Sequence, residues 1–283
     1  MKVLVTGASG MCGGEIAGYL DGCGHEVTGT YKTHKIRRRY RMVCCDMTRE
    51  IALDEAFDVI VHCAGVLPYQ NPTMREYVSG NIDSMRNLLD FAQKKCIHRM
   101  IYLSTIGVYG EFVDETVDED SPKVEPDGYG MTKYMAEKLL AEDKQIKGIS
   151  LRCPGIIGKY ARAVWLSEVA EKMKRGETVK VSTPEFMTQN IVHVNDLARF
   201  IEVLMNKDTW KYGELLIASR EKMKVGEIIR LMKEQFQSES KIVEISASRE
   251  PFSLNPRRAL EEGYAPMGII EAVRKYCMEI LGR

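Results

Sequence analysis

The 283-residue sequence has no window that approaches the roughly 18 uninterrupted apolar residues of a membrane-spanning helix. Its N-terminal apolar stretch reaches glycines after only a few residues. It therefore lacks the long apolar core and the small-residue cleavage site of a secretory signal. We expect a cytoplasmic protein that does not have a membrane as its partner.

The sequence also has no excess of charge of either sign, because 40 Lys and Arg residues balance 40 Asp and Glu residues. A neutral chain has no overall electrostatic attraction to nucleic acid or to an anionic membrane, so we expect no nucleic-acid partner. With 45% hydrophobic and 28% charged residues, the chain is too apolar to be disordered. Its length suits one large domain or two modest ones.

Metal-binding patterns are absent as well. None of the eight cysteines forms a Cys-x-x-Cys pair, and no set of His, Cys and carboxylate residues has the spacing of a zinc site. Most cysteines lie in apolar segments, which favours buried, reduced thiols over disulfides. We interpret His62, on an apolar run, and His193 as structural residues, and we predict no metal site.

The first two thirds of the chain alternates short β-branched runs with longer segments of helical periodicity. The runs at 58–63 and 100–104 are almost continuously apolar, which is typical of strands that helices cover on both faces. Repeated β-α-β units of this kind predict an α/β protein with a doubly wound parallel sheet. The expected strands are 2–6, 26–31, 42–45, 58–63, 99–104 and 149–153, and the expected helices are 13–20, 74–95 and 129–146.

After about residue 155 this alternation loosens. We predict a first domain over residues 1–155, with segments near 186–220 that return to its sheet. Residues 156–185 and 221–283 would form a small mixed α/β lobe. Helices are expected there at 162–175, 195–206, 225–237 and 267–281, and strands at 178–181, 191–194, 214–217 and 242–245.

Two local runs of charge stand out against the neutral total. Residues 31–41 hold six Lys and Arg residues and no acid, whereas residues 111–127 hold eight acids and the single basic residue Lys123. Blocks of like charge are mostly solvated, and we expect the acidic run to be a solvated loop. The basic run follows the second strand, where it bears on cofactor choice.

A glycine-rich loop at 6–13, TGASGMCG, follows the first strand-like run and opens the first predicted helix. Its glycines allow a tight turn, a close approach to a pyrophosphate and close packing of helix on strand, while the helix N-terminus faces the anion. This placement predicts dinucleotide binding in an NAD(P)-binding Rossmann domain. The residues assigned to this contact are Gly7, Ser9, Gly10, Met11 and Gly13.

Cofactor choice is usually decided about 20 residues further on, where an acid at the end of the second strand holds the ribose 2′-hydroxyl of NAD. Here the strand ends at Tyr31 and Lys32 without a carboxylate, and Arg37 and two further arginines follow. Lys and Arg pair with a 2′-phosphate, whereas a carboxylate would repel it. We therefore predict that NADP is preferred over NAD, with Tyr31, Lys32 and Arg37 at the cofactor.

Tyr129 and Lys133 are four residues apart at the start of a predicted helix, which places both side chains on one helical face. An ammonium group beside a phenol favours the phenolate, so we expect Lys133 to lower the pKa of Tyr129. Such a tyrosine can exchange a proton with a substrate oxygen while hydride moves to or from a nicotinamide. The fifth strand ends in Ser104 and Thr105, where an α/β sheet places ligand-contacting groups.

The order of these motifs resembles the extended short-chain dehydrogenase/reductase family, which comprises NAD(P)-dependent sugar epimerases, dehydratases and related reductases. The resemblance covers nearly the whole chain. It rests on the glycine loop at 6–13, Asp46-Met47, His62–Gly65, Asn81, Ser104–Gly110, Tyr129 with Lys133, Leu151-Arg152 to Gly158, and Ile191–Asp196.

The resemblance implies a role for each matching residue. Thr105 would be the catalytic hydroxyl with Ser104 beside it, Tyr129 the acid and base, and Lys133 a ligand of the nicotinamide ribose. The further cofactor contacts it implies are Asp46 and Met47 by the adenine, Cys63, Ala64 and Gly65 by the cofactor backbone, Asn81, and Cys153 and Pro154 near the nicotinamide. The C-terminal lobe would bind a small-molecule sugar or carbonyl substrate, and the helices at 74–95 and 129–146 would form a homodimer.

The resemblance leaves more than one reaction open. Family members that are 4,6-dehydratases carry an Asp-Glu pair directly after the strand-five threonine, where this chain has Ile106 and Gly107, so dehydration is disfavoured. A ketoreductase that consumes NADPH is favoured by the basic run, and a nucleotide-sugar C4 epimerase that retains its cofactor is the alternative. A non-catalytic NADP-binding sensor or scaffold is a third hypothesis, although such proteins usually lack the tyrosine or the lysine.

Two positions that help nucleotide-sugar epimerases to hold the substrate diphosphate depart from the family pattern. Gly155 stands where an Asn is usual, and Gln189 where an Arg is usual. Loss of a charge-assisted partner costs about 1.5–3 kcal/mol unless another cation replaces it, so the substrate is either a nucleotide sugar held differently or a smaller carbonyl compound. The candidates for that cation are Arg162, Arg249, Arg257 and Arg258. The residues assigned to the substrate are Val66, Gly155, Arg162, Gln189 and Arg249.

Overall fold

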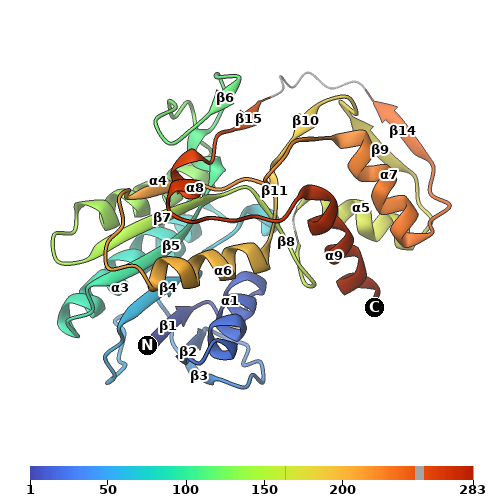
Figure 1. Ribbon diagram of the computed structural model, residues 1–283. Coiled ribbons are helices and arrows are strands. Elements are labelled where there is room, and N and C mark those ends of the chain that lie inside the picture. Colours follow the sequence, from blue (N-terminus) through green and yellow to red (C-terminus); the bar gives the residue numbers. More distant parts are fainter. Residues whose placement is uncertain (163, 246–251, 283) are drawn as a thin grey trace.

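A computed structural model describes residues 1–162, 164–245 and 252–282. At its centre lies a seven-stranded parallel sheet with the strand order β12-β7-β5-β4-β1-β2-β3 (Figure 1). The strands are β1 (Lys2–Thr6), β2 (Glu26–Tyr31), β3 (Arg41–Cys44), β4 (Val59–His62), β5 (Arg99–Thr105), β7 (Lys147–Cys153) and β12 (Glu214–Leu216). The predicted doubly wound α/β fold is confirmed, and the strand order reverses between β1 and β4.

Helices cover both faces of this sheet, which explains why its strands are apolar on both sides. Val3 and Val5 of β1 belong to a buried cluster with α1 and α6, whereas Leu4 between them belongs to a cluster with α3 and α4 on the opposite face. These helices are α1 (Met11–Gly22), α3 (Ser84–Lys94), α4 (Gly128–Glu142) and α6 (Val194–Met205).

The segment predicted as one helix at 74–95 contains three elements. A short helix α2 (Met74–Tyr77) passes through a π-helical segment η2 (Val78–Asp83) into α3. A π-helical turn adds a residue to the helical repeat and re-aims the side chains around it, and such turns are frequent at functional sites. Here the turn carries the buried Asn81. Two short 3₁₀ helices, η1 (Pro68–Gln70) and η3 (Ile106–Tyr109), follow β4 and β5.

A second hydrophobic cluster lies in the C-terminal part of the chain, on the right of Figure 1. It joins α5 (Trp165–Lys174), α7 (Val225–Phe236) and α9 (Ile269–Leu281) to β9 (Val179–Ser182), which pairs in parallel with β14 (Ile242–Ile245). The remaining elements are β6 (Thr116–Val117), β8 (Gly155–Ile157), β10 (Met187–Thr188), β11 (Ile191–His193), β13 (Met223–Lys224), β15 (Ser253–Leu254) and α8 (Arg257–Glu261).

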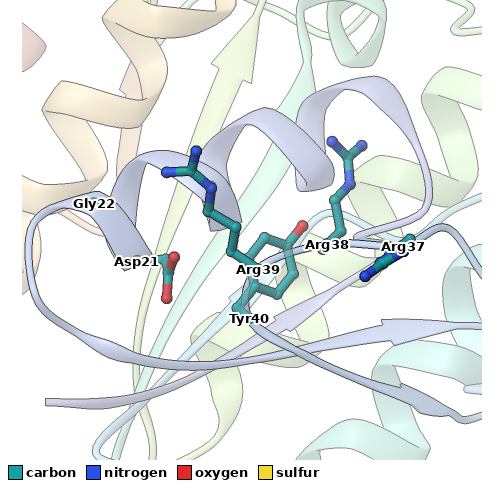
Figure 2. Close-up of a pocket in the computed structure, with 7 residues that line it drawn as sticks. Asp21, Gly22, Arg37, Arg38, Arg39 and Tyr40 are labelled. Atoms are coloured by element: carbon teal, nitrogen blue, oxygen red, sulfur yellow. The ribbon is translucent and has the colours of Figure 1, made fainter.

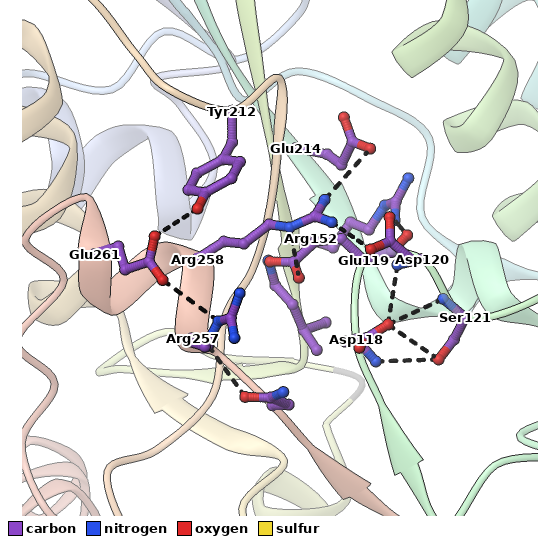
Figure 3. Close-up of polar contacts among 12 residues, drawn as sticks. Asp118, Glu119, Asp120, Ser121, Arg152, Tyr212, Glu214, Arg257, Arg258 and Glu261 are labelled. Atoms are coloured by element: carbon purple, nitrogen blue, oxygen red, sulfur yellow. Dashed lines mark hydrogen bonds and ion pairs between the residues drawn. The ribbon is translucent and has the colours of Figure 1, made fainter.

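Most acids of the run at 111–127 are exposed, as its charge predicts, but Glu119 is an exception. Glu119 is only 3% exposed, and its carboxylate accepts a hydrogen bond of 2.7 Å from Leu216 N in β12. Arg258 of α8 lies 3.7 Å from Glu119 and also pairs with Asp120 (Figure 3). The prediction of a solvated run is wrong for Glu119, because the part-buried Arg258 from another part of the chain pairs with its carboxylate.

Both histidines interpreted as structural have structural contacts. His193 accepts a hydrogen bond of 3.2 Å from Asn195 N and so caps α6, and His62 is buried on β4.

All eight cysteines are free, but the expectation of burial is wrong for Cys23, Cys44 and Cys96, which are exposed. Within the described residues, no helix is long and apolar enough to cross a membrane, and no group of three His, Cys or acidic side chains is placed to hold a metal.

Helix α4 begins in close contact with the backbone that follows β5, and this contact predicts a large effect of a single methyl group. A Cβ at Gly130 would lie 2.0 Å from the carbonyl oxygen of Gly107. We expect G130A to lower the free energy of unfolding by about 2 kcal/mol in denaturant titration, since a backbone atom cannot rotate away. The control is G18A in α1, where a Cβ meets nothing within 4 Å.

Because Ala is the better helix former, we expect G18A to raise the free energy of unfolding by about 0.5–1 kcal/mol. A G130A protein that is as stable as G18A would contradict the packing of α4 on η3.

Candidate active site

The glycine loop after β1 leaves no room for side chains at Gly7 and Gly13, and no side chain covers the N-terminus of α1 that follows it. Gly7 has φ +67°, and a Cβ there would lie 2.9 Å from Ala64 Cα. A Cβ at Gly13 would lie 2.5 Å from the carbonyl oxygen of Gly7. No side chain caps α1 at Gly10, and its first turn contains no acid. The loop therefore fits a pyrophosphate, which backbone N–H groups and the helix dipole can hold.

Thr6 fastens the ends of β1 and β4 to each other where the strand order reverses. Its hydroxyl accepts hydrogen bonds of 3.1 Å from Cys63 N and Ala64 N, and lies 2.7 Å from Nδ1 of His62. Burial, with the positive charge of Lys133, lowers the pKa of His62 to about 3, so the imidazole is neutral. In open α/β sheets ligands bind in the crevice at this point.

Asn81 connects the loop after β4 to helix α4. Its Oδ1 accepts a hydrogen bond of 2.8 Å from Val66 N, and its Nδ2 donates one of 3.0 Å to Thr132 Oγ1. A Cβ at Gly65 would lie 2.9 Å from Asn81 Oδ1. Asn81 therefore holds Gly65 and Val66 beside the helix that carries Tyr129.

Thr105 and Tyr129 are brought together, as the sequence predicts. Thr105 ends β5, its Oγ1 accepts a hydrogen bond of 3.0 Å from Gly107 N, and its hydroxyl also hydrogen-bonds the phenol of Tyr129. The expected low pKa of Tyr129 is wrong for this structure. Burial raises the pKa of the phenol, and the Thr105 hydroxyl offsets this only in part. The phenol is therefore protonated at neutral pH and can donate a proton to a carbonyl oxygen.

Lys133 lies one turn after Tyr129 and is only 5% exposed. Its Nζ donates a hydrogen bond of 2.5 Å to Leu103 O in β5 and lies 4.1 Å from the ring centroid of Tyr102. Burial lowers the pKa of Lys133 to about 8, against the opposing effect of Glu137. The ammonium group thus lies against the strand that ends in Thr105.

Ser104 is not brought to the phenol. Its hydroxyl donates a hydrogen bond to Glu137, whose carboxylate also accepts one of 2.8 Å from Arg152 Nη2 in β7. Successive residues of a strand point to opposite faces, so Thr105 and Ser104 cannot both face the site. The sequence-based analysis missed Glu137, although it follows Lys133 at the same four-residue spacing.

The predicted cofactor cations fall into two groups. Lys32 Nζ lies 3.2 Å from Asp46 Oδ2, so this lysine already has a carboxylate partner. Arg37 and Arg38, with Arg39 and Tyr40, line a groove of about 490 Å³ beside α1 (Figure 2). Within the described ranges none of the arginines at 37–39 forms an ion pair with a carboxylate, and Arg38 Nε is buried without a hydrogen-bond partner.

The other predicted cofactor residues lie at or just after the ends of sheet strands, and several of them are buried. Tyr31 ends β2, and Ser9 and Met11 lie in the glycine loop, all three partly buried. Cys153 ends β7 and, with Pro154, is buried. Met47 is 6% exposed and belongs to the hydrophobic cluster under the sheet, so its side chain contributes to the core.

Two of the predicted substrate residues are engaged in the fold. The side chain of Gln189 is buried and donates a hydrogen bond to Leu254 O of β15. Gly155 N donates one of 3.2 Å to Asn190 O, and a Cβ at Gly155 would lie 2.9 Å from Val164 Cγ1. An asparagine there would require Val164 to move.

Of the three candidate arginines that the structure describes, one forms no ion pair with a described residue. Arg257 lies 3.3 Å from Glu261, and Arg258 pairs with Glu119 and Asp120. Arg249 lies outside the described residues. Arg162 is exposed, and it forms no ion pair in the part of the chain that the structure describes.

Residues 3–218 match the NAD dependent epimerase/dehydratase family. The chain belongs to this family. It is 23% identical over 288 residues to UDP-glucose 4-epimerase of Corynebacterium glutamicum, which covers 92% of this chain and 84% of the relative. It is 26% identical over 231 residues to dTDP-glucose 4,6-dehydratase of Streptomyces niveus, which covers 72% and 69%.

Among solved structures, UDP-glucuronic acid 4-epimerase from Bacillus cereus in complex with NAD superposes with a TM-score of 0.85. The match covers 100% of this chain and 99% of that chain at 18% identity. At this identity the likeness establishes the fold. Together with the family match and the glycine loop, it supports a cofactor of the NAD(P) type.

Burial of Lys133 predicts a stability effect that depends on pH. Its folded-state pKa of about 8 lies below the unfolded value of about 10.4. Below pH 8 both states are protonated and the folded state bears the full penalty, about 3 kcal/mol. As pH rises from 8 to 10.4 the folded state loses its proton first, so its relative stability increases.

We therefore expect K133M to be more stable than the wild-type protein by about 2 kcal/mol at pH 7, after about 1 kcal/mol is lost because Leu103 O loses its donor. This advantage should shrink toward pH 10 in denaturant titrations. K138M, which replaces an exposed lysine of the same helix, is the control and should change stability by less than about 0.5 kcal/mol. An advantage of K133M that is independent of pH would contradict the lowered pKa.

Proposed function

We propose that this protein is an NAD(P)-dependent enzyme that transfers hydride at an alcohol or carbonyl carbon of a nucleotide sugar, and that it works as a C4 epimerase. The observation that carries the proposal is the convergence of Thr105, Tyr129 and Lys133 beside the uncapped N-terminus of α1. Relatives named UDP-glucose 4-epimerase support the epimerase reaction. Ile106 and Gly107 argue against dehydration, because neither side chain can transfer a proton.

The residues present fit the cofactor. Gly7, Gly10 and Gly13 would hold its pyrophosphate, and Lys133 would hold the nicotinamide ribose. When bound, the nicotinamide would supply the hydride carrier and, in its oxidised form, a positive charge next to Tyr129.

Tyr129 would exchange a proton with the oxygen on the reacting carbon, and Thr105 would orient that oxygen through its own hydroxyl. Oxidation of the alcohol needs the phenolate, and reduction of the ketone needs the phenol. The raised pKa of Tyr129 makes the second form the resting one.

The substrate diphosphate would be held differently from the family pattern, because Gln189 and Gly155 are engaged in the fold. Arg162 is the described arginine that remains for this role. It lies between β8 and α5, next to Ala161, which packs against the C-terminal cluster.

A ketoreductase that consumes NADPH is the second candidate, and the unpaired arginines at 37–39 favour it. The two candidates differ in what they need from solution. An epimerase should copurify with its cofactor and interconvert UDP-glucose and UDP-galactose without added nucleotide. A requirement for one NADPH per product molecule would overturn the epimerase proposal in favour of the reductase.

Removal of the Tyr129 hydroxyl tests the proposed chemistry. We expect Y129F to lower kcat by about 10²–10⁴-fold, because a positioned acid and base contributes that much, while cofactor affinity changes little. The control is Y19F, which removes a phenolic hydroxyl from α1 and should retain full activity. Turnover by Y129F at the wild-type rate would exclude the proposed mechanism.

The basic run tests the preference for NADP, which we propose because β2 ends without an acid. We expect tighter binding of NADPH than of NADH by nucleotide fluorescence, and a loss of about 10–100-fold in NADPH affinity in the double variant R37A/R38A. NADH affinity should stay within about twofold. R41A is the matched control, because Arg41 belongs to the same run but pairs with Glu55.

Equal or tighter binding of NADH by the wild-type protein would end the proposal of an NADP preference. It would leave the epimerase proposal in place.

A further inference from the structure

Glu137 lies on α4 one turn after Lys133, at the same spacing that separates Lys133 from Tyr129. Tyr129, Lys133 and Glu137 are each four residues apart, so the three side chains lie along one face of the helix. Glu137 is only 5% exposed, which is unusual for a carboxylate unless it is paired. The proposed function gives it no role.

Both oxygens of the Glu137 carboxylate accept hydrogen bonds from residues near the ends of strands that border the candidate site. Oε1 accepts the hydroxyl of Ser104, the residue before Thr105 on β5. Arg152, the residue before Cys153 on β7, donates to Oε2 from Nε at 3.1 Å and from Nη2 at 2.8 Å. The carboxylate thus connects the penultimate residues of two neighbouring strands, β5 and β7, that border the reacting groups.

Arg152 carries this connection further. Its Nη1 donates hydrogen bonds of 3.1 Å to Tyr109 Oη and 2.9 Å to Glu119 O. Tyr109 lies in η3, the 3₁₀ helix that immediately follows Thr105, so the backbone on both sides of Thr105 is held by the same pair of ions. A buried ion pair that loses one partner leaves an uncompensated charge, so both members are needed.

Glu137 also provides the negative charge nearest in sequence to the buried Lys133. The other groups that face Lys133 are thiols and rings from the surrounding elements, and none of them carries a full negative charge at neutral pH. They are Cys12 of α1, His62 of β4, Cys63 after β4, Tyr102 of β5, Tyr129 of α4 and Cys153 of β7. The Coulomb attraction of Glu137 opposes the desolvation of the ammonium group.

We propose that Glu137 is a positioning residue for hydride transfer: it holds Thr105 in place through Ser104 and Arg152, and it keeps Lys133 positively charged. The inference has two halves. The catalytic half, that Glu137 affects hydride transfer, rests on the proposed function. The electrostatic half, that Glu137 keeps Lys133 charged, concerns the protein without cofactor.

The electrostatic half is tested by titration of the apo protein. With ¹³C-labelled lysine, the Cε resonance that is missing in K133M reports the protonation of Lys133. The wild-type midpoint is expected at about pH 8. E137Q keeps the length and shape of the side chain but removes its charge, and its amide nitrogen replaces one of the two oxygens that accept hydrogen bonds from Ser104 and Arg152. Its midpoint should fall by about one pH unit, as expected for removal of a nearby charge at intermediate dielectric.

E142Q is the matched control, because Glu142 is an exposed acid on the same helix, and it should leave the midpoint unchanged. A midpoint in E137Q equal to that of the wild-type protein would overturn the inference.

The catalytic half is tested by the pH profile of turnover. Because E137Q would lose the Lys133 proton at lower pH, the alkaline limb of its kcat profile should move down by about one pH unit, whereas a merely structural defect would lower kcat equally at every pH. S104A keeps the charge and removes one hydrogen bond, so it should lower kcat without moving the limb. An unshifted limb in E137Q would contradict the inference.

If E137Q does not fold, E137D provides the test, because it keeps the charge but is too short to bond Ser104. It should keep the Lys133 midpoint and lower kcat, and an unchanged kcat would overturn the positioning role. Should no variant or wild-type protein turn over nucleotide sugars, the proposed function fails, while the lysine titration still decides the electrostatic half.

Discussion

The arrangement of the candidate active site depends on one unfavourable placement, the burial of a lysine ammonium group beneath the cofactor crevice. Lys133 is removed from water and donates to the backbone of β5, against the ring of Tyr102. Desolvation of a charge is costly unless a counter-charge compensates it. The counter-charge comes from Glu137, one turn further along α4, and Glu137 in turn needs Arg152. Strand ends, helix and lysine are therefore positioned by one connected set of charges.

This set of charges also joins the parts of the chain that border the crevice. Arg152 reaches the acidic run through Glu119 O, and the Glu119 carboxylate reaches β12 and Arg258 of α8. Residues from the N-terminal sheet and from the last quarter of the chain thus share one buried polar network. The thiols around Lys133 stay protonated, since burial raises the pKa of Cys12 to about 12 and also raises that of Cys153.

Much of this fold is contained in local patterns. The bounds of β1, β2 and β14 match the predicted strands, because continuous β-branched runs between turn residues define them. The glycine loop and the four-residue spacing of Tyr129 and Lys133 also predict their places, since both follow from strand-to-helix geometry. Two-residue strands such as β6 and β15 leave no periodicity from which to predict them.

The predictions that failed concern residues whose properties are decided by their tertiary surroundings. The pKa of Tyr129 was predicted from its helical neighbour, but burial decides it. Glu119 belongs to an acidic run and is nevertheless buried beside Arg258. Because Arg258 lies far away in the sequence, the run alone does not predict this pair. Ser104 was wrongly placed beside Thr105 in the site, although side chains alternate between the two faces of a strand. Its hydroxyl instead bonds Glu137, which follows Lys133 at the same four-residue spacing.

The central proposal is that Tyr129 exchanges the proton on the sugar oxygen, and that the C4 hydrogen moves as hydride, for which a bound nicotinamide would be the carrier. The most direct measurement follows deuterium at C4 of UDP-glucose through turnover in ordinary water. The account predicts that the C4 epimer keeps its deuterium, because the transferred hydride does not exchange with solvent. Loss of the deuterium to water, or its replacement by solvent hydrogen, would show removal of C4 hydrogen as a proton and would contradict the account.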